Sequence, residues 1–230
     1  CQRFLTNPVI EDATITVTLQ GWTQTGTTAR DALVGGAQAD HLVGGTGAAN
    51  ELIGGAGDDW YTVEAVGDTI VELAGGGTDF VYTNLASFVM PSEVERLFYV
   101  GTGSTFAGIG NASDNIIGGS PGRDLLVGGA GNDTLQGNGA GAGNENFLIG
   151  GTGNDIYIVS VLGDSTVELA DEGIDEVRTS LATYALQANI ENLTFSAGNI
   201  PHAAGVGNAL DNVITGASAY DELFGLAGND

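Results

Sequence analysis

The chain has 230 residues, 39 of them glycine, and its 29 acidic side chains outnumber 5 arginines, which gives a formal net charge of -24. Without a cluster of basic side chains the protein cannot neutralise phosphates, so nucleic acids and anionic membrane surfaces are excluded as partners. Because 42% of the residues are hydrophobic and only 15% are charged, the chain can form a core once its acids are neutralised.

The sequence predicts neither an internal disulfide nor a transmembrane helix, and we favour a cut from a longer protein over lipidation as the explanation of the N-terminal cysteine. The single cysteine, Cys1, permits no internal disulfide, and there is neither a run of 18 apolar residues nor a signal peptide pattern. The chain starts at a cysteine and stops inside GLAGND, so we expect both ends to continue into a longer protein.

Residues 1–25 precede the repetitive part of the chain. Within them TITVTLQ, from Thr14, alternates in polarity and predicts a half-buried strand. We interpret this segment as the end of a preceding spacer or as a leading strand.

A nonapeptide of the form G-G-x-G-x-D-x-U-x, where U is apolar, recurs from residue 26 onward. Its clearest copies are GGAGDDWYT from Gly54, GGAGNDTLQ from Gly128 and GGTGNDIYI from Gly150. The copies form arrays over 26–62, 109–158 and 206–230, the last one truncated, and β-rich spacers occupy 63–108 and 159–205. Array and spacer together repeat with an offset of about 96 residues, so the chain holds nearly two such units.

Each copy predicts a tight turn followed by a short strand. Glycine permits the turn, and in the three extended residues that follow, the middle one points inward. These inward residues are Leu33, Leu42, Tyr61, Ile116, Leu126, Leu135, Tyr157, Val213 and Leu223. Because so short a strand buries its apolar side chain only by stacking, we expect an all-β, right-handed parallel β-roll or β-helix, a solenoid with almost no α-helix.

Stacked turns bring backbone carbonyls and aspartate carboxylates together, and an oxygen cage without histidine or cysteine suits Ca²⁺. The aspartates expected to bind several such ions are Asp31, Asp40, Asp59, Asp114, Asp124, Asp133, Asp155, Asp211, Asp221 and Asp230. The glycines expected to contribute are Gly54, Gly55, Gly57, Gly128, Gly129, Gly131, Gly150, Gly151, Gly153 and Gly228. Where Asn50 and Asn146 replace aspartate, or Gln38 replaces glycine, we expect weak or empty sites.

These nonapeptides resemble the RTX, or haemolysin-type calcium-binding, repeat family over residues 26–230. The resemblance implies a β-roll with Ca²⁺ in its turns. It also implies a large bacterial protein, exported by type I secretion, that acts outside the cell or at its surface.

The spacers carry four pairs of acids that match across the two units: Asp68 and Asp164, Glu72 and Glu168, Asp79 and Asp175, and Glu95 and Glu191. We expect them on a solvated strand face or as turn caps, in preference to the alternative that they are additional Ca²⁺ ligands. Asp79→Ala should therefore weaken calcium binding less than Asp133→Ala.

We find no catalytic constellation in the sequence and expect no enzymatic activity from this segment. GGSPG around Ser120 matches a nucleophile elbow, but Pro121 removes the N–H that an oxyanion hole needs. His41 and His202 are outside any metal-binding motif, and we expect both at the surface.

Two functions remain open. The favoured one is a structural or interaction segment of an adhesin, surface-layer or filament protein, which binds calcium and assembles end to end with further repeats or copies of itself. The alternative is the C-terminal calcium and secretion module of an RTX exoenzyme, such as a protease, lipase or alginate epimerase.

Overall fold

The computed structural model describes residues 21, 23–103, 105–139, 143–196, 200–218 and 220–230. These residues form strands and turns and contain no helix, so within them nothing is long and apolar enough to cross a membrane as a helix. The strand predicted from Thr14 lies outside the described residues. The chain divides into two compact units, Cys1–Asp79 and Phe80–Asp230.

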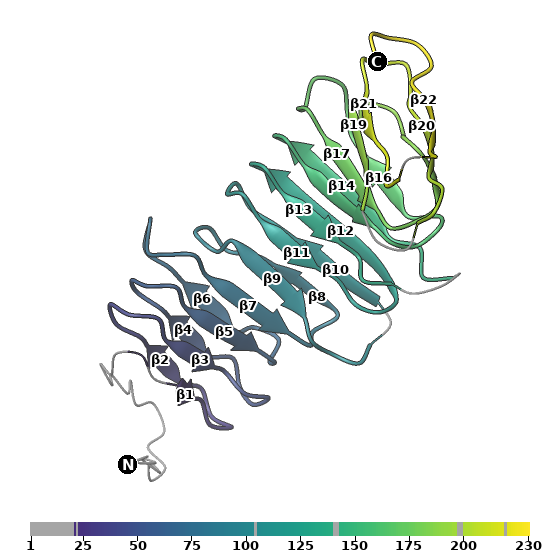
Figure 1. Ribbon diagram of the computed structural model, residues 1–230. Coiled ribbons are helices and arrows are strands. Elements are labelled where there is room, and N and C mark those ends of the chain that lie inside the picture. Colours follow the sequence, from purple (N-terminus) through teal and green to yellow (C-terminus); the bar gives the residue numbers. More distant parts are fainter. Residues whose placement is uncertain (1–20, 22, 104, 140–142, 197–199, 219) are drawn as a thin grey trace. The chain divides into compact units, whose positions relative to one another are not determined.

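In the first unit consecutive strands alternate between two parallel sheets (Figure 1). One sheet contains β1 (Thr23–Thr25), β3 (His41–Val43) and β5 (Trp60–Val63) in that order. The other contains β2 (Ala32–Val34), β4 (Glu51–Ile53) and β6 (Thr69–Val71). The chain therefore winds as a parallel solenoid.

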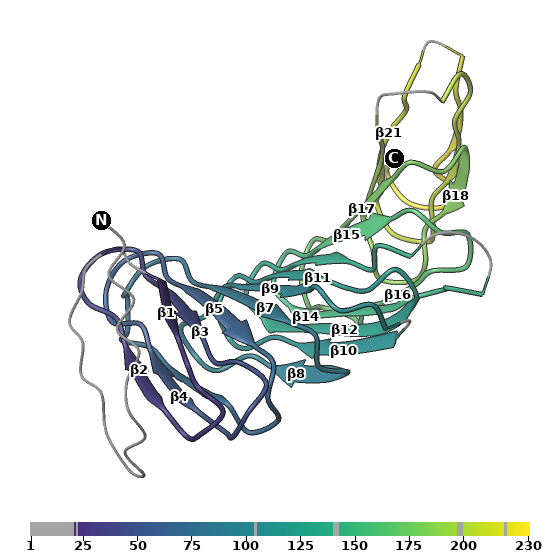
Figure 2. The ribbon, with the colours of Figure 1, turned by 90° about the horizontal axis from the view of Figure 1, so that it is seen from below.

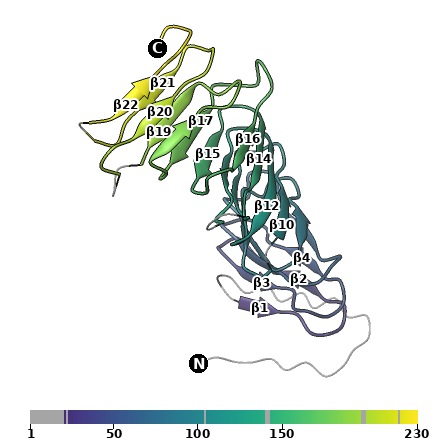
Figure 3. The same ribbon diagram turned by 90° about the vertical axis from the view of Figure 1, so that its right-hand side faces the viewer.

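The second unit repeats this winding, with its two rows of strands visible in Figure 2 and its last strands in Figure 3. One row runs through β7 (Phe80–Thr83), β9 (Arg96–Tyr99), β11 (Ile116–Gly118), β13 (Thr134–Gln136), β15 (Ile156–Val159), β17 (Glu176–Thr179), β19 (Asn192–Phe195) and β21 (Val213–Thr215). The opposite row has one sheet of β8 (Ser87–Val89), β10 (Thr105–Ile109), β12 (Arg123–Ala130), β14 (Phe147–Thr152) and β16 (Ser165–Val167), and another of β18 (Thr183–Ala185), β20 (Ala204–Val206) and β22 (Glu222–Phe224). The two units contain about 10 turns, which confirms the predicted parallel β-solenoid.

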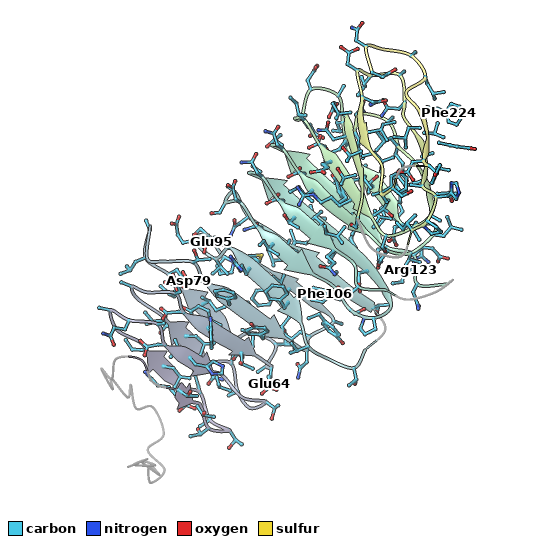
Figure 4. All side chains as sticks on the ribbon, in the orientation of Figure 1. Glu64, Asp79, Glu95, Phe106, Arg123 and Phe224 are labelled. Carbon is cyan, nitrogen blue, oxygen red and sulfur yellow. The ribbon has the colours of Figure 1, made fainter. Side chains whose placement is uncertain are left out.

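The core of each unit consists of inward side chains stacked in register from strand to strand. In the second unit Leu135 lies between Ile117 and Tyr157, and all three are fully buried. Burying one such side chain stabilises the fold by about 1.5–3 kcal/mol. On the opposite row Gly108 has no side chain, and the ring of Phe106 (labelled in Figure 4) fills the space beside it.

The predicted inward residues are correct for Leu33, Leu42, Tyr61, Leu126, Leu135 and Tyr157, which are all buried. The prediction is wrong for two others. Ile116 is half-buried while Ile117 is fully buried, and Val213 is 64% exposed, because Gly110 and Gly207 are the first glycines of their turns, which moves the inward position one residue along the chain. Leu223 points inward beside Gly205 as predicted, but it is 39% exposed because β22 pairs with β20 on one side only.

Spacer residues form strands in the same sheets as array residues, as β6 and β16 show. The fold therefore does not change where an array is expected to end and a spacer to begin. The division of the sequence into arrays and spacers stays a prediction.

Candidate metal centres

The acids that end the turns form a ladder along one edge of each unit. In the first unit Asp59 Oδ1 accepts a hydrogen bond from the N–H of Asp40 at 2.7 Å, and Asp79 Oδ1 accepts one from the N–H of Asp59 at 2.7 Å. In the second unit Asp155 Oδ1 accepts from the N–H of Asp133 at 2.7 Å, and Asp175 Oδ1 from the N–H of Asp155 at 2.8 Å. One carboxylate oxygen of each rung thus joins successive turns.

The second oxygen divides the turns into two kinds. In the first kind, which we call amide-capped turns, Oδ2 accepts an N–H from its own turn. Asp40 accepts from Gly36 at 2.8 Å, and Asp124 accepts from Ser120 at 2.7 Å. Asp31 and Asp221 are capped in the same way, by Thr27 and Ser218. In each of these four carboxylates, Oδ2 therefore already has a hydrogen-bond donor from its own turn.

In the second kind, which we call open turns, Oδ2 is buried and has no hydrogen-bond partner. The open turns are residues 54–59, 128–133 and 150–155, and their unpartnered atoms are Oδ2 of Asp59, Asp133 and Asp155. The second and fourth residues of these turns are glycines with positive φ, namely Gly55 and Gly57, Gly129 and Gly131, and Gly151 and Gly153. Only glycine adopts this backbone readily, so the clean nonapeptides are the ones that form open turns.

The first glycine of each open turn is needed for space. A Cβ on Gly54, Gly128 or Gly150 would lie under 3.0 Å from Oδ2 of the aspartate in the same turn. At Gly128 the carbonyl oxygen of Gly150 also lies 2.7 Å from that point. A carboxylate and a carbonyl of neighbouring turns therefore converge on one place, which is the donor chemistry that Ca²⁺ prefers.

Two of the open turns have further acids around the unpartnered oxygen. Oxygens of Asp59, Glu72 and Asp79 all lie within 4.8 Å of one another, and so do oxygens of Asp155, Glu168 and Asp175. The hydroxyl groups of Tyr61 and Tyr157 donate hydrogen bonds to Glu72 and Glu168 respectively. Asp79, which is labelled in Figure 4, and Asp175 are each 1% exposed.

The predicted solvated face is therefore wrong for several spacer acids. Asp79, Asp164, Glu168 and Asp175 are buried, because the spacer turns stack on the array turns and continue the ladder. The alternative prediction of turn caps is confirmed for Asp68 and Asp164. Asp68 Oδ1 accepts the N–H of Asn50 at 2.8 Å, and Asp164 Oδ1 accepts the N–H of Asn146 at 2.9 Å.

Burial without a counter-charge perturbs these acids strongly. Desolvation raises the pKa of Asp133 to about 7 and that of Asp59 to about 6, and neighbouring carboxylates add to the effect. Desolvation also raises the pKa of Glu168 to about 8 and that of Asp175 to about 6. In contrast, the N–H of Ser218 lowers the pKa of the amide-capped Asp221. A bound cation would therefore stabilise the ionised carboxylates of the open turns and of the adjacent spacer acids Glu168 and Asp175.

Two of the predicted ligands, Asp114 and Asp211, do not occupy the buried rung of the ladder. Both are exposed, and the following residues, Asn115 and Asn212, occupy the rung with 1% and 2% exposure. The sequence offers aspartate and asparagine side by side at both places, and the strand register selects the asparagine.

Asp230 combines features of both kinds of turn. Its Oδ1 accepts the N–H of Asn212 at 3.0 Å, and Leu226 and Gly228 have positive φ, as in an open turn. Its side chain is nevertheless exposed.

On the edge of each unit opposite the open turns, asparagine side chains donate hydrogen bonds to nearby carbonyl and carboxylate oxygens. Asn50 Nδ2 donates to the carbonyl of Gly44 at 2.9 Å, and Asn146 Nδ2 donates to Asp164 Oδ1 at 3.0 Å. These amide hydrogens supply the positive partner that a neighbouring carboxylate would otherwise lack. They support the expectation of weak or empty sites there, which stays a prediction.

The residues that resembled catalytic groups have structural partners. Ser120 is buried, and its hydroxyl donates to Asp124 Oδ1 at 2.6 Å within an amide-capped turn. His202 is exposed, as predicted, whereas His41 is half-buried, with Nε2 3.0 Å from the hydroxyl of Thr62.

Comparison with known proteins agrees with the geometry of the turns. A family model described as the RTX calcium-binding nonapeptide repeat matches four copies, over residues 25–60, 34–70, 109–141 and 206–230. The chain contains RTX calcium-binding repeats. The RTX matches include the open turns at Asp59 and Asp133 but not the one at Asp155. RTX repeats typically occur in secreted bacterial proteins.

One curated protein to which this chain is similar is the endo-1,3-1,4-beta-glycanase ExsH of Rhizobium meliloti (strain 1021), which is 36% identical over 94 residues. The aligned part covers 41% of this chain and 20% of the glycanase, so the chain spans about a fifth of that relative. No solved structure matches the chain.

Proposed function

We propose that this chain is a calcium-folded RTX segment whose open turns bind Ca²⁺ through Asp59, Asp133 and Asp155. The observation that carries the proposal is the unpartnered Oδ2 of each of these side chains, all of which are at most 1% exposed. A buried carboxylate without a partner is strongly unfavourable, and a divalent cation removes that penalty. The amide-capped acids Asp31, Asp40, Asp124 and Asp221 serve the same turns structurally and contribute less to binding.

Calcium fits this donor set better than other metals. The converging atoms are carboxylate and carbonyl oxygens, which suit hard cations, and calcium tolerates irregular sets of six to eight oxygens. Tightly hydrated Mg²⁺ requires a stricter geometry. The glycines at 54, 55 and 57, and their equivalents in the other two open turns, shape each cage.

Calcium titration tests the proposal. We expect EDTA-treated protein to lose its β-sheet signal in far-UV circular dichroism and to recover it as CaCl₂ is added. The midpoint should lie near the affinities of about 10⁻⁴ to 10⁻³ M that are typical of extracellular modules. A native spectrum and a sharp thermal transition before calcium is added would contradict the proposal.

We further propose that the segment is structural rather than catalytic, and that it belongs to a secreted or cell-surface bacterial protein. The RTX repeats and the structural partners of Ser120 and His41 support this role. The alternative, a calcium module of an exoenzyme, is raised by the name of the glycanase relative. That relative aligns over only 20% of its own length, so the alignment does not support glycanase activity in this chain.

Assembly with further copies stays a prediction. Testing it distinguishes a structural segment from the calcium module of an exoenzyme. We expect calcium to increase the light scattering of the intact source protein, and EDTA to reverse the increase. Monodisperse protein combined with turnover in glycanase, protease, lipase or epimerase assays would favour the exoenzyme role instead.

A further inference from the structure

The two acidic clusters occupy equivalent places, where an open turn is followed on the same edge by the second turn of the spacer, residues 72–79 in the first unit and 168–175 in the second. We call them the junction clusters: Asp59, Glu72 and Asp79 in the first unit, and Asp155, Glu168 and Asp175 in the second. Each contains one acid from the nonapeptide array and two from the spacer. Among the residues that the structure describes, no comparable cluster of three acids includes Asp133.

The open turns with a third acid differ from the one at Asp133 in a single neighbouring residue, which is glutamate in the first case and glycine in the second. Val71 pairs with Ile53, and Val167 pairs with Ile149, so the next residue of each spacer strand lies beside the first glycine of the open turn. That next residue is Glu72 in the first unit and Glu168 in the second. The corresponding neighbour of Gly128 is Gly150, which has no side chain.

The acids of each cluster point to a common centre. A Cβ placed on Gly150 would lie under 3.0 Å from Asp155 Oδ2, from Glu168 Oε1 and from the hydroxyl of Tyr157. The same is true at Gly54 for Asp59, Glu72 and Tyr61. Two oxygens bound to one calcium ion at 2.3–2.6 Å can be about 5 Å apart, so carboxylate oxygens within 4.8 Å can share one ion.

Unpartnered buried atoms show that these clusters are incomplete. Asp155 Oδ2 and Glu168 Oε2 have no hydrogen-bond partner, and the two residues are 1% and 6% exposed. Asp59 Oδ2 is in the same condition in the first unit. Several carboxylates held together away from water are stable only with a cation or with bound protons.

We propose that each junction cluster is a calcium site of a second kind, in which a spacer glutamate and a spacer aspartate complete the coordination begun by the array. Calcium then joins the second turn of the spacer to the last turn of the array on the same edge. This inference rests on the proposed calcium-binding function and extends it to spacer residues. Glycine, aspartate, tyrosine, glutamate and aspartate occur in both clusters with one offset: Gly54 and Gly150, Asp59 and Asp155, Tyr61 and Tyr157, Glu72 and Glu168, Asp79 and Asp175.

The test compares Glu168→Gln with Asp171→Asn in the full chain, with CaCl₂ as the probe. Asp171 belongs to the same spacer turn, is exposed and has a φ of 67°, which asparagine tolerates well. Isothermal titration calorimetry should show that Glu168→Gln loses one site or weakens it at least tenfold, while Asp171→Asn binds as the wild type does. The double variant Glu72→Gln, Glu168→Gln should lose two sites and retain the one at Asp133.

Hydrogen exchange and thermal unfolding distinguish a metal site from a merely structural carboxylate. In calcium, Glu168→Gln should lose amide protection over residues 168–175 but keep it over 128–133. In saturating calcium it should unfold at a lower temperature than the wild type, and its unfolding temperature should rise less steeply with CaCl₂ concentration, because one binding site has been lost. Loss of an ordinary hydrogen bond would lower the unfolding temperature by the same amount at every calcium concentration.

If the wild type binds calcium and Glu168→Gln shows the same number of sites, the same affinities and the same protection, the inference is overturned while the proposed function stands. If the wild type binds no calcium, the proposed function fails, and the inference fails with it.

Discussion

At the scale of single residues, aspartates with the same place in the repeat have different chemistry. Asp124 and Asp133 are both buried in the second unit and both end a turn. Oδ2 of Asp124 accepts the N–H of Ser120, whereas Oδ2 of Asp133 has no partner. The positive φ of Gly129 and Gly131 accompanies the open form, so the backbone of the turn decides which carboxylate is left for a cation.

Asp133→Asn should therefore remove a calcium site, and Asp124→Asn should not. The asparagine at 133 keeps the volume and the hydrogen bond from Asn115 but loses the charge that calcium requires. We expect calorimetry to show one site fewer, or an affinity at least tenfold weaker, for Asp133→Asn alone. Equal losses in both variants would mean that amide-capped turns bind calcium too.

At the scale of elements, the two ends of a spacer make different contacts. The end that leads into the next array is held by asparagine hydrogen bonds, whereas the end that follows an array carries the acidic cluster. Asn208 Nδ2 donates to the carbonyls of Gln187 and Ile190, both at 2.7 Å. Asn111 Nδ2 donates in the same way to Pro91 at 2.6 Å and Val94 at 2.8 Å. At the start of an array, an asparagine side chain thus donates hydrogen bonds to carbonyls of the preceding spacer. At the end of an array, carboxylates cluster instead.

Asn208→Ala should lower stability without changing calcium binding. The substitution removes the side-chain donor to the carbonyl of Gln187 and leaves Ile190 with only the longer hydrogen bond from Asn212 Nδ2 at 3.4 Å. An unsatisfied buried group costs about 1–3 kcal/mol. In saturating calcium we expect a lower denaturation midpoint and an unchanged number of calcium ions by calorimetry. Asn229→Ala, at an exposed position, is the matched control and should change neither. A loss of calcium sites in Asn208→Ala would contradict a purely structural role for this side chain.

At the scale of the whole molecule, a net charge of -24 opposes a compact state in two separable ways. Repulsion between exposed acids acts over long distances and is screened by any salt. The unpartnered oxygens of the open turns and junction clusters are buried, and they need a ligand in direct contact. Screening and coordination therefore make different contributions to folding.

Sodium chloride should fail to replace calcium. At 0.5 M salt the Debye length falls to about 4 Å, which suppresses surface repulsion but leaves the buried carboxylates unsatisfied. We expect EDTA-treated protein in 0.5 M NaCl to stay without its native far-UV circular dichroism spectrum, and millimolar CaCl₂ to restore it. Recovery in NaCl alone would show that surface repulsion is the main obstacle to folding.

Sequence periodicity was sufficient to predict the class of fold and the class of ligand. Glycine and aspartate recur every nine residues with an apolar residue in phase, and this pattern is local, because each copy specifies its own turn and its own inward side chain. The burial of Leu42, Leu126 and Leu135 confirms the inward positions, and the matched RTX repeats confirm the repeat pattern. The prediction failed where aspartate and asparagine are adjacent, as at Asp114 and Asn115, because local pattern does not determine strand register.

Only the tertiary structure decided which acids gather and which oxygens lack partners. Glu72 and Asp79 lie 13 and 20 residues after Asp59, and winding of the chain brings them onto the next turn beside it. The spacer turn is longer than the nonapeptide turn, so the spacing by itself gives no sign of this contact. A carboxylate is satisfied or left unpartnered according to neighbours one full turn away, and those neighbours are defined by stacking rather than by adjacency in the chain.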